Sequence, residues 1–466
     1  MTARPLAPAE ERPSATKPRE YQFPRFERRS LSNGARLVVA PAHKLPLVTV
    51  LVLVDAGAVA DPEGQDGLAV LTARAIAEGT RSADGAALVE RFERLGTALE
   101  TSADWDAAVL RLTVLRERLE EALALLGEVL VFPTFPEREI ERLKQERLAE
   151  ILQLRAEPRG LADEMLGRFL YAEDSRYAMP EGGSPASVAK LTSGDVARFY
   201  RQRYRPRSTT LIFAGDVTTD DAERLSTRAL GRWIGDPVAP VSIAIEPRFT
   251  ERRVHLVSRT DAPQSELRVG HMGPPRSHPR YFPATVMNAV LGGLFSSRIN
   301  LNLREVHAYT YGAFSGFEWR RGPGPWAVST AVRSDVTDAA ARETVDEILR
   351  IRKQMISLEE LSLATSYLDG VFPIRYETTA AIAGALANLH LYDLPDDYFD
   401  TYRARIRAVS AADVLESAAK DLDPERLQLV VVGDPATVRA PLERLEFGPL
   451  TVYDDEGRAI ESSRKD

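Results

Sequence analysis

An internal duplication is the sequence feature that most restricts how this chain can fold. A helix start with Thr192 as its expected N-cap is followed by an apolar run that ends at Gly215. The same arrangement returns near the end of the chain, with Ser410 as the expected N-cap and an apolar run that ends at Gly433. Both pairs of landmarks are 218 positions apart. This spacing predicts two copies of one structural unit.

A second pair of landmarks gives nearly the same spacing. Glu139 and Leu143 lie in one expected helix, and Glu359 and Leu363 lie in another, 220 positions later. A unit of about 220 residues is an ordinary domain size. For the 466-residue chain we therefore expect a disordered tail over 1–23, a first domain over 24–236, a linker over 237–250, a second domain over 251–455 and a tail over 456–466.

Within each half, strands are expected to come before most of the helices. Apolar runs predict strands over 35–40, 47–54 and 108–114, and apolar residues at helical spacing predict helices over 67–78, 84–95, 117–131 and 137–155. This order favours an α+β fold class with two homologous domains, each a mainly antiparallel sheet covered by helices.

The composition excludes several classes of function. The chain has no cysteine, which rules out thiolate zinc ligands, iron–sulfur clusters and cysteine nucleophiles. With 60 Lys+Arg against 68 Asp+Glu, and a net charge of -8, we expect no nucleic-acid partner. No apolar run is long enough to span a membrane, and the first twenty residues contain no secretory signal. We expect a soluble protein, with the cytoplasm favoured and the periplasm as the alternative.

The segment 67–80 carries the first resemblance to a known family. It reads Gly-Leu-Ala-Val-Leu-Thr-Ala-Arg-Ala-Ile-Ala-Glu-Gly-Thr and resembles the signature helix of the M16 (pitrilysin) zinc peptidases. Active members of that family have His-x-x-Glu-His between a similar glycine and a similar Gly-Thr pair. Carried over by position, the two histidines fall on Val70 and Arg74 and the glutamate falls on Ala73. The third metal ligand of the family falls on Glu150.

These four positions do not form a zinc site. Zinc needs lone pairs from neutral imidazoles or carboxylates, and Val70 and Ala73 offer none, while Arg74 carries a permanent positive charge. We expect Glu150 to pair with a cation such as Arg74. No two of the six histidines are four residues apart, so no other helix offers a two-histidine face. The chain is therefore expected to bind no metal or other cofactor.

The segment 288–316 carries the second resemblance. Its Gly-Gly, Ser-Ser-Arg and Leu-Arg-Glu motifs, with a tyrosine seven residues after the last arginine, resemble the C-terminal-domain signature of M16 proteins. Arg304 and Tyr311 match the Arg/Tyr pair that, in the family, reaches substrate at a zinc on another domain. A guanidinium and a phenol can stabilise a developing oxyanion or hold a peptide backbone. If 309–314 is a strand, Tyr309 points to the same face as Tyr311, but the spacing favours Tyr311.

The resemblance implies a non-catalytic subunit of a heterodimeric M16 zinc metallopeptidase. Arg304 and Tyr311 would contact a peptide or a small unfolded protein, while a sister chain with His-x-x-Glu-His would supply the zinc. Two alternatives stay open. One is an inactive structural protein that is similar to the core subunits of a respiratory complex, and the other is a homodimeric peptide-binding chaperone.

Overall fold

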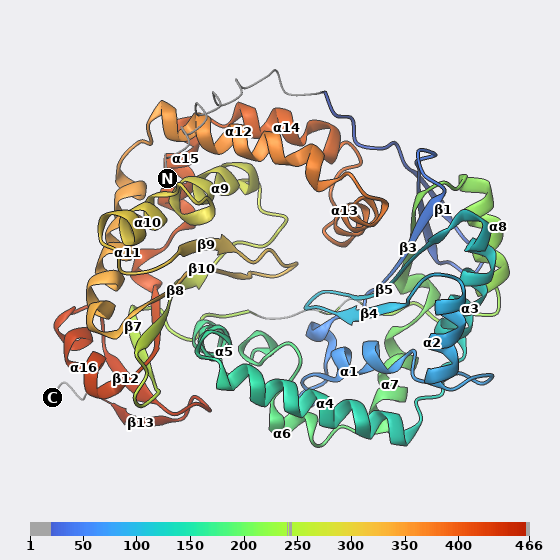
Figure 1. Ribbon diagram of the computed structural model, residues 1–466, viewed down its shortest axis with the longest axis horizontal. Coiled ribbons are helices and arrows are strands. Elements are labelled where there is room, and N and C mark those ends of the chain that lie inside the picture. Colours follow the sequence, from blue (N-terminus) through green and yellow to red (C-terminus); the bar gives the residue numbers. More distant parts are fainter. Residues whose placement is uncertain (1–19, 240, 242–244, 463–466) are drawn as a thin grey trace, which may run out of the picture.

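The computed structural model describes residues 20–239, 241 and 245–462, and it contains two sheets on opposite sides of the molecule (Figure 1). The first sheet has six strands in the order β1-β2-β6-β3-β5-β4. Its strands are β1 (Glu27–Ser30), β2 (Arg36–Pro41), β3 (Leu47–Val54), β4 (Glu100–Ala103), β5 (Ala108–Leu115) and β6 (Thr209–Gly215).

The second sheet has seven strands in the order β13-β12-β7-β11-β8-β10-β9. Its strands are β7 (Arg253–Ser258), β8 (Gln264–Met272), β9 (Ala313–Phe317), β10 (Pro325–Arg333), β11 (Gln428–Gly433), β12 (Leu450–Tyr453) and β13 (Ala459–Ser462). The order β7-β11-β8-β10-β9 repeats the order β2-β6-β3-β5-β4 of the first sheet. In both series the first two strands are parallel and the remaining pairs are antiparallel. The expected fold class and the duplication behind it are confirmed.

Helices cover both sheets. The helices of the first half are α1 (Leu68–Ala75), α2 (Gly85–Arg94), α3 (Leu119–Val131), α4 (Glu137–Ala156), α5 (Pro158–Leu170), α6 (Pro185–Val188), α7 (Ser193–Arg203) and α8 (Thr219–Leu230). Those of the second half are α9 (Tyr281–Asn288), α10 (Arg298–Asn300), α11 (Thr337–Lys353), α12 (Leu358–Arg375), α13 (Thr379–Leu391), α14 (Tyr398–Ala408), α15 (Ala411–Asp421) and α16 (Pro435–Arg444). Two π-helical segments, η5 (Ala289–Gly293) and η6 (Leu301–Val306), follow α9 and α10.

The expected N-caps at the duplicated helix starts are present. The side chain of Thr192 accepts a hydrogen bond from the backbone N–H of Asp195, and that of Ser410 accepts one from Asp413. Each aspartate carboxylate in turn accepts a hydrogen bond from the backbone N–H of its cap residue, which completes a capping box. These contacts involve residues three apart, which is why the local sequence predicts them.

The central strands of the first sheet are buried on both faces. In β6, Leu211 and Phe213 pack into one core cluster, whereas Ile212 and Ala214 pack into another. Side chains alternate between the faces of a strand, so a continuous apolar run of this kind requires cover on both sides. Helices α1, α2, α3, α7 and α8 contribute to the first cluster.

The remaining face of each sheet is covered by a helix that comes from the other half of the chain. Helix α5, from the first half, packs on β8 and β11 of the second sheet, and α13, from the second half, packs on β3 and β6 of the first sheet. Phe169 of α5 stacks on His255 of β7 with 4.0 Å between ring centroids. The hydroxyls of Thr49 on β3 and Thr379 on α13 lie 2.8 Å apart. Each half therefore needs a helix of the other to bury its sheet.

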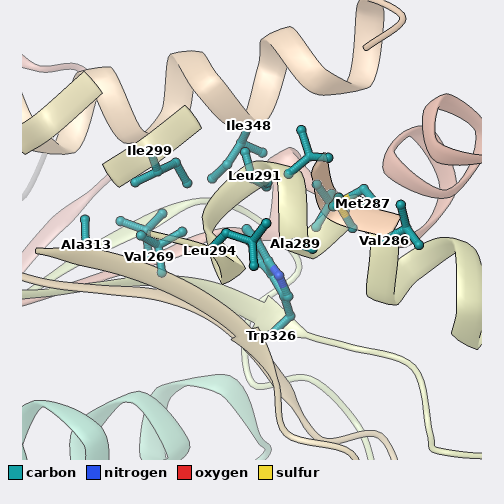
Figure 2. Packing of buried hydrophobic residues seen from close by; sticks show 14 of the residues in the cluster. Val269, Val286, Met287, Ala289, Leu291, Leu294, Ile299, Ala313, Trp326 and Ile348 are labelled. Carbon is teal, nitrogen blue, oxygen red and sulfur yellow. The ribbon is translucent and has the colours of Figure 1, made fainter. Parts of the chain in front are cut away.

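The core of the second half packs α9, η5 and α11 on its sheet. Trp326 of β10 is fully buried, and Figure 2 shows it beneath Leu294, with Leu291 and Ile348 on the helical side. Its indole nitrogen donates a hydrogen bond of 3.0 Å to Asn288 Oδ1, which satisfies the polar atom of this large buried ring.

The expected tails over 1–23 and 456–466 are wrong in part, because some residues of each pack against the folded domains. Phe23 is 6% exposed and stacks on Phe399 at 4.3 Å, because its ring fills a gap in the core of the second half. Residues 459–462 form β13, which continues the second sheet beyond β12. In the expected linker, Glu246 and Arg248 hydrogen-bond to the backbone just beyond and at the end of α5. Residues 1–19, 240, 242–244 and 463–466 lie outside the described residues.

Candidate functional site

The N-terminus of α1 is held by a buried carboxylate. Asp61 accepts hydrogen bonds from the backbone N–H groups of Gly67 (2.8 Å) and Ala69 (2.7 Å), and from Arg176 Nη2 (2.8 Å). Gly67 has a φ of 92°, and a Cβ there would meet the carbonyl oxygen of Gly182 at 2.7 Å. The glycine that frames the segment is thus required both by backbone conformation and by close approach of another loop.

Helix α1 carries three of the four expected metal positions, and the fourth, Glu150, lies on the neighbouring helix α4. Val70 is half-buried and Ala73 is 1% exposed. Arg74 Nη1 donates to Glu150 Oε1 at 2.8 Å, which is the ion pair expected from the sequence. Glu150 Oε2 accepts a second bond, of 3.1 Å, from Arg147 Nη1. The hydrogen bond from Arg74, which is the largest effect, and that from Arg147 lower the pKa of Glu150, although partial burial acts in the opposite direction.

This donor set does not fit zinc. Of the four positions only Glu150 has an acceptor, and two guanidinium groups already occupy it. A metal ion at this point would also lie against the cation of Arg74. Across the described parts of the chain, no cluster of three or more His, Asp or Glu side chains is arranged to hold a metal ion.

A cavity of about 620 Å³ opens beside this ion pair. Val70 and Arg74 of α1 line it together with parts of α4, α5 and the loop 177–183. Glu318, Arg320 and Pro325 of the second half line it as well, so both halves contribute to its wall. Figure 1 shows α4 along the bottom of the view, where it contacts both α1 and α5.

Strand β4 forms one wall of the cavity through Thr101, Ser102 and Ala103. It lies at the end of the first sheet and pairs with β5 alone. In the part of the chain that the structure describes, no side chain hydrogen-bonds to its outer edge. An edge strand of this kind presents free backbone N–H and C=O groups to which an extended segment can pair.

Arg304 and Tyr311 lie elsewhere, in the segment that joins α10 to β9 in the second half. The Arg304 guanidinium lies 4.6 Å from the ring centroid of Phe295, and its Nε is 3.3 Å from Glu305 Oε1. Tyr311 is 91% exposed. Neither residue lines the cavity. The structure therefore does not bring the Arg/Tyr positions together with the former metal positions of the same chain.

Strand β9 begins only at Ala313, so the condition that 309–314 forms a strand is wrong. Tyr309 is half-buried and stacks on His307 at 4.9 Å, whereas Tyr311 faces solvent. The backbone turns before the strand because the Thr310 hydroxyl accepts a hydrogen bond from the N–H of Gly312 and donates one to the carbonyl oxygen of the same residue. The two tyrosines consequently have different surroundings.

The segment that carries Arg304 is anchored to neighbouring helices. Asn302 Nδ2 donates to Glu343 and Glu347 of α11, both at 3.0 Å. Arg298 forms a two-bond ion pair with Glu360 of α12, with Nε–Oε1 at 2.5 Å, so its contact is structural. Rare π-helical geometry such as that of η6 is often found at functional sites.

Several exposed apolar side chains lie close to Arg304 and Tyr311 along the chain, and one of them, Phe295, contacts Arg304. Phe295 is 59% exposed, Val306 74% and Phe314 46%. A soluble monomer seldom leaves so many large apolar groups together in water, and aromatic and arginine side chains are typical of interfaces. This surface, Phe295, Arg304, Val306, Tyr311 and Phe314, is called the Arg304 surface below.

Sequence reasoning did not identify three charged residues of the cavity wall, Arg147, Glu181 and Arg320. They come from three separate segments, and none belongs to a motif. Burial raises the pKa of Glu181 to about 7, with the charge of Asp104 adding to this effect. Strand β4 was missed as well, because its sequence Glu-Thr-Ser-Ala is short and polar.

Among the described residues, no helix combines the length and the apolar character needed to cross a membrane.

Comparisons with known proteins agree with this architecture. The family model for insulinase (peptidase family M16) matches residues 36–177, and the model for the peptidase M16 inactive domain matches residues 190–368. A Streptomyces coelicolor chain named as an uncharacterized zinc protease is 22% identical over 89% of this chain and 91% of its own length. The non-peptidase homolog YmxG of Helicobacter pylori is 23% identical over 80% of this chain and 85% of its own length.

Solved structures show the same fold. The crystal structure of a peptidase M16 inactive domain from Pseudomonas fluorescens superposes with a TM-score of 0.83 at 25% identity, covering 88% of this chain and 98% of the other. A chain of complex III2 from Candida albicans reaches a TM-score of 0.74 at 15% identity, covering 90% and 99%. The two family models together match most of the chain, and the chain belongs to the peptidase M16 family.

Proposed function

We propose that this chain is a metal-free, non-catalytic M16 subunit that completes the peptide-cleaving site of a zinc-bearing M16 sister chain. The observation that carries the proposal is the separation of two features. The former metal positions hold the Arg74–Glu150 ion pair, while Arg304 and Tyr311 lie on an exposed apolar surface away from them. The metal that carries out hydrolysis and the Arg/Tyr pair would then come from different polypeptides.

Two features of the chain support a peptide as the ligand. The open edge of β4 offers backbone pairing to any extended segment, without regard to its side chains. The Arg304 surface offers a guanidinium, a phenol and aromatic rings, which suit a peptide held between two subunits. The names of the relatives support the metal-free role, since one is called a non-peptidase homolog and one structure an inactive domain.

The chemistry assigns different tasks to the two side chains. The zinc of the sister chain would supply the hydrolytic chemistry, during which negative charge would develop on the peptide carbonyl oxygen. Arg304 would stabilise that charge with a fixed cation, and Tyr311 would donate its O–H. The weak local contacts of Arg304, a ring and a neighbouring carboxylate, leave its guanidinium available for this purpose.

The test is co-purification with an M16 chain that carries His-x-x-Glu-His, followed by peptide hydrolysis assays. Arg304→Ala should lower kcat/KM of the complex by about 100-fold, as expected when one oxyanion donor is lost, and Tyr311→Phe should lower it less. Arg138→Ala is the control, because the side chain of Arg138 is 95% exposed on α4, in the other half. Unchanged hydrolysis by the Arg304→Ala complex would rule the role out.

A structural role is the second candidate, and the same experiment distinguishes it. The likeness to a chain of complex III2 shows that this fold also occurs in a large assembly. A structural subunit would form a stable complex in which both Arg304→Ala and Tyr311→Phe leave activity unchanged. It would also co-purify with proteins that carry no His-x-x-Glu-His helix.

A further inference from the structure

The outward face of α12 is apolar. Leu363 is 49% exposed, Tyr367 53% and Ile374 71%, and a Cβ added at Gly370 would meet nothing within 4 Å. These four positions are spaced by four, three and four residues, so they lie on one face of the helix. They are called the α12 stripe below.

The opposite face of α12 is buried in the second half. Ala364 and Phe372 belong to its core, and Asp369 forms a two-bond ion pair with Arg403 of α14. Figure 1 shows α12 at the upper margin of the molecule, beside α14. The stripe is therefore the part of this helix that its own half leaves uncovered.

Helix α4 is the counterpart of α12 in the duplicated unit, and its outward face is polar. Aligned by burial, Leu143 and Ile151 of α4 correspond to Ala364 and Phe372 of α12. In that alignment the four positions of the stripe carry Arg142, Glu146, Ala149 and Gln153, all exposed. Arg142 and Glu146 form an ion pair with Nη1–Oε1 at 2.6 Å. The fold of the unit therefore does not require apolar side chains at these positions.

The stripe has the pattern expected for contact with another helix. Large apolar side chains grouped on one solvent-facing surface are typical of interaction sites, and tyrosine is common in such contacts. The alternation of spacings of four and three residues is that of the contact line between two helices that pack along each other.

The stripe is complementary to a second copy of itself. When two α12 helices pack antiparallel about a two-fold axis midway along the stripe, Leu363 of each copy faces Ile374 of the other, and Tyr367 faces Gly370. The tyrosine ring of each copy then lies in the space that the glycine of the other leaves open. A two-fold interface requires a patch that matches itself in this way.

Charges at the two ends of α12 favour the same orientation. Glu359 is exposed at the N-terminal end, and Arg375 is exposed at the C-terminal end. Antiparallel packing brings Glu359 of one copy within one helical turn of Arg375 of the other, because Arg375 then faces Ser362. Parallel packing would instead place like charges, and the two tyrosine rings, against each other.

We propose that this chain forms a homodimer through antiparallel packing of the α12 stripes of two copies. The proposal goes beyond the proposed function and requires no zinc-bearing sister chain. The stripe contains no residue of the Arg304 surface, so the contact between copies and the contact with a sister chain use different residues.

The first experiment is sedimentation velocity of the lone chain from about 1 to 100 µM, a range that includes the affinities of many weak dimers. The mass should approach twice that of the chain. Tyr367→Glu and Ile374→Glu should each weaken dimerisation at least about 100-fold, because two-fold symmetry places each added charge at two points of the interface. Gln153→Glu, at the corresponding position of α4, is the matched control and should have no effect.

Three outcomes of this experiment would overturn the proposal. They are a chain that stays monomeric over the whole range, a dimer that forms only after a sister chain is added, and a dimer that Gln153→Glu weakens as much as Ile374→Glu does. Since the substituted residues are exposed, thermal unfolding should show that every variant folds like the wild type.

Single cysteines report the orientation, because the chain has none of its own. In the antiparallel dimer Gly370 lies about 5 Å along the axis from its own counterpart, whereas Leu363 lies about 16 Å from its counterpart. A bismaleimide that bridges about 8–10 Å, the separation of packed helices, should therefore cross-link Gly370→Cys but not Leu363→Cys. An equal mixture of Leu363→Cys and Ile374→Cys should cross-link, and Ala149→Cys on α4 is the control for random collision.

Cross-linking of Leu363→Cys alone would indicate parallel packing, and no cross-linking of Gly370→Cys would place the interface elsewhere. Either result would overturn the proposal. Neither bears on the activity of the Arg304→Ala complex, so the proposed function is tested separately.

Discussion

The equivalent edge strands of the two halves, β4 and β9, have different surroundings. Residues of β4 line a cavity, and helix α1, which carries three of the former metal positions, packs against β4 and lines the same cavity. The outer edge of β9 is closed by two asparagines. Asn300 Oδ1 accepts from the backbone N–H of Ala313, and Asn288 Nδ2 donates to the carbonyl oxygen of Ser315, both at 3.0 Å.

The difference follows from the helical segment that packs beside each edge strand. In the first half the helix after the second strand of the unit ends early, at Ala75, and the edge stays open. In the second half α9 continues as η5, whose Gly292 packs so closely on Ser315 that a Cβ would lie 2.4 Å from Ser315 Oγ. The edge of β4 keeps its backbone groups free, whereas the edge of β9 is covered by side chains of the segment that precedes it.

The largest expected effect comes from restoring the metal ligands in the first half. The triple variant Val70→His, Ala73→Glu, Arg74→His should bind one zinc ion with a Kd below about 1 µM, equivalent to about 8 kcal/mol, because two histidines four apart face Glu150. Arg74 already reaches Glu150 at 2.8 Å, so a ligand at that position is close enough. Metal content after dialysis measures the effect, and adding Glu150→Gln should weaken it. A folded triple variant without zinc would show that the α1–α4 geometry differs from an active site.

A second prediction compares the two edges by removing one side chain from each. Asn288→Ala should lower the free energy of unfolding by about 2–4 kcal/mol, because Ser315 and the buried indole of Trp326 lose their partners. Ser102→Ala on β4 should change it by less than about 0.5 kcal/mol. Urea unfolding curves give both values. Similar losses at the two positions would mean that β4 is also covered.

A third prediction concerns the close packing of η5 on β9. Gly292→Ala should destabilise by about 1–3 kcal/mol, since the added methyl group overlaps Ser315. Gly316→Ala is the matched control, because a Cβ there meets nothing within 4 Å. The difference in urea midpoint between the two variants is the measurement, and a difference near zero would show that η5 can move away from the strand.

The smallest expected effect is a change of stability with pH on the open side. The folded pKa of Glu181, about 7, lies above its ordinary value of 4.5, so folding favours the protonated form. The stability that protonation contributes is complete below pH 4.5 and is lost as the pH rises through 7. Glu181→Gln should therefore match the wild type at pH 4.5 and exceed it at pH 8 by about 1 kcal/mol, allowing for partial exposure. Urea midpoints at the two pH values test this, and a constant difference would refute it.

The parts of the fold that depend on near neighbours could be predicted from the sequence. The caps at Thr192 and Ser410 bond residues three positions away, and the run 47–54 matches β3. The packing of α5 and α13 on the opposite sheets could not be predicted. An apolar helix face shows that a helix is buried, but it does not show which of two similar sheets it covers.

Some features of the candidate site could likewise be predicted from the sequence, and others could not. A reader of the sequence can see that Val70 and Ala73 have no metal-binding atoms, because the side chain alone decides that. The same reader can expect the Arg74–Glu150 pair, since both lie in segments that resemble family motifs. Nothing local places Arg320 beside Trp105 or leaves its Nη1 without a partner.

The sequence by itself determined the duplication, the longer helices and apolar strands of the first half, and the lack of metal-binding atoms at Val70 and Ala73, because each rests on side-chain chemistry or on spacing along the chain. The tertiary structure decided which edge strand stays open, which helix covers which sheet, and which charges meet in the cavity. These outcomes depend on the packing of segments far apart in the chain, where many arrangements satisfy the same local preferences and only the sum of their contacts selects one.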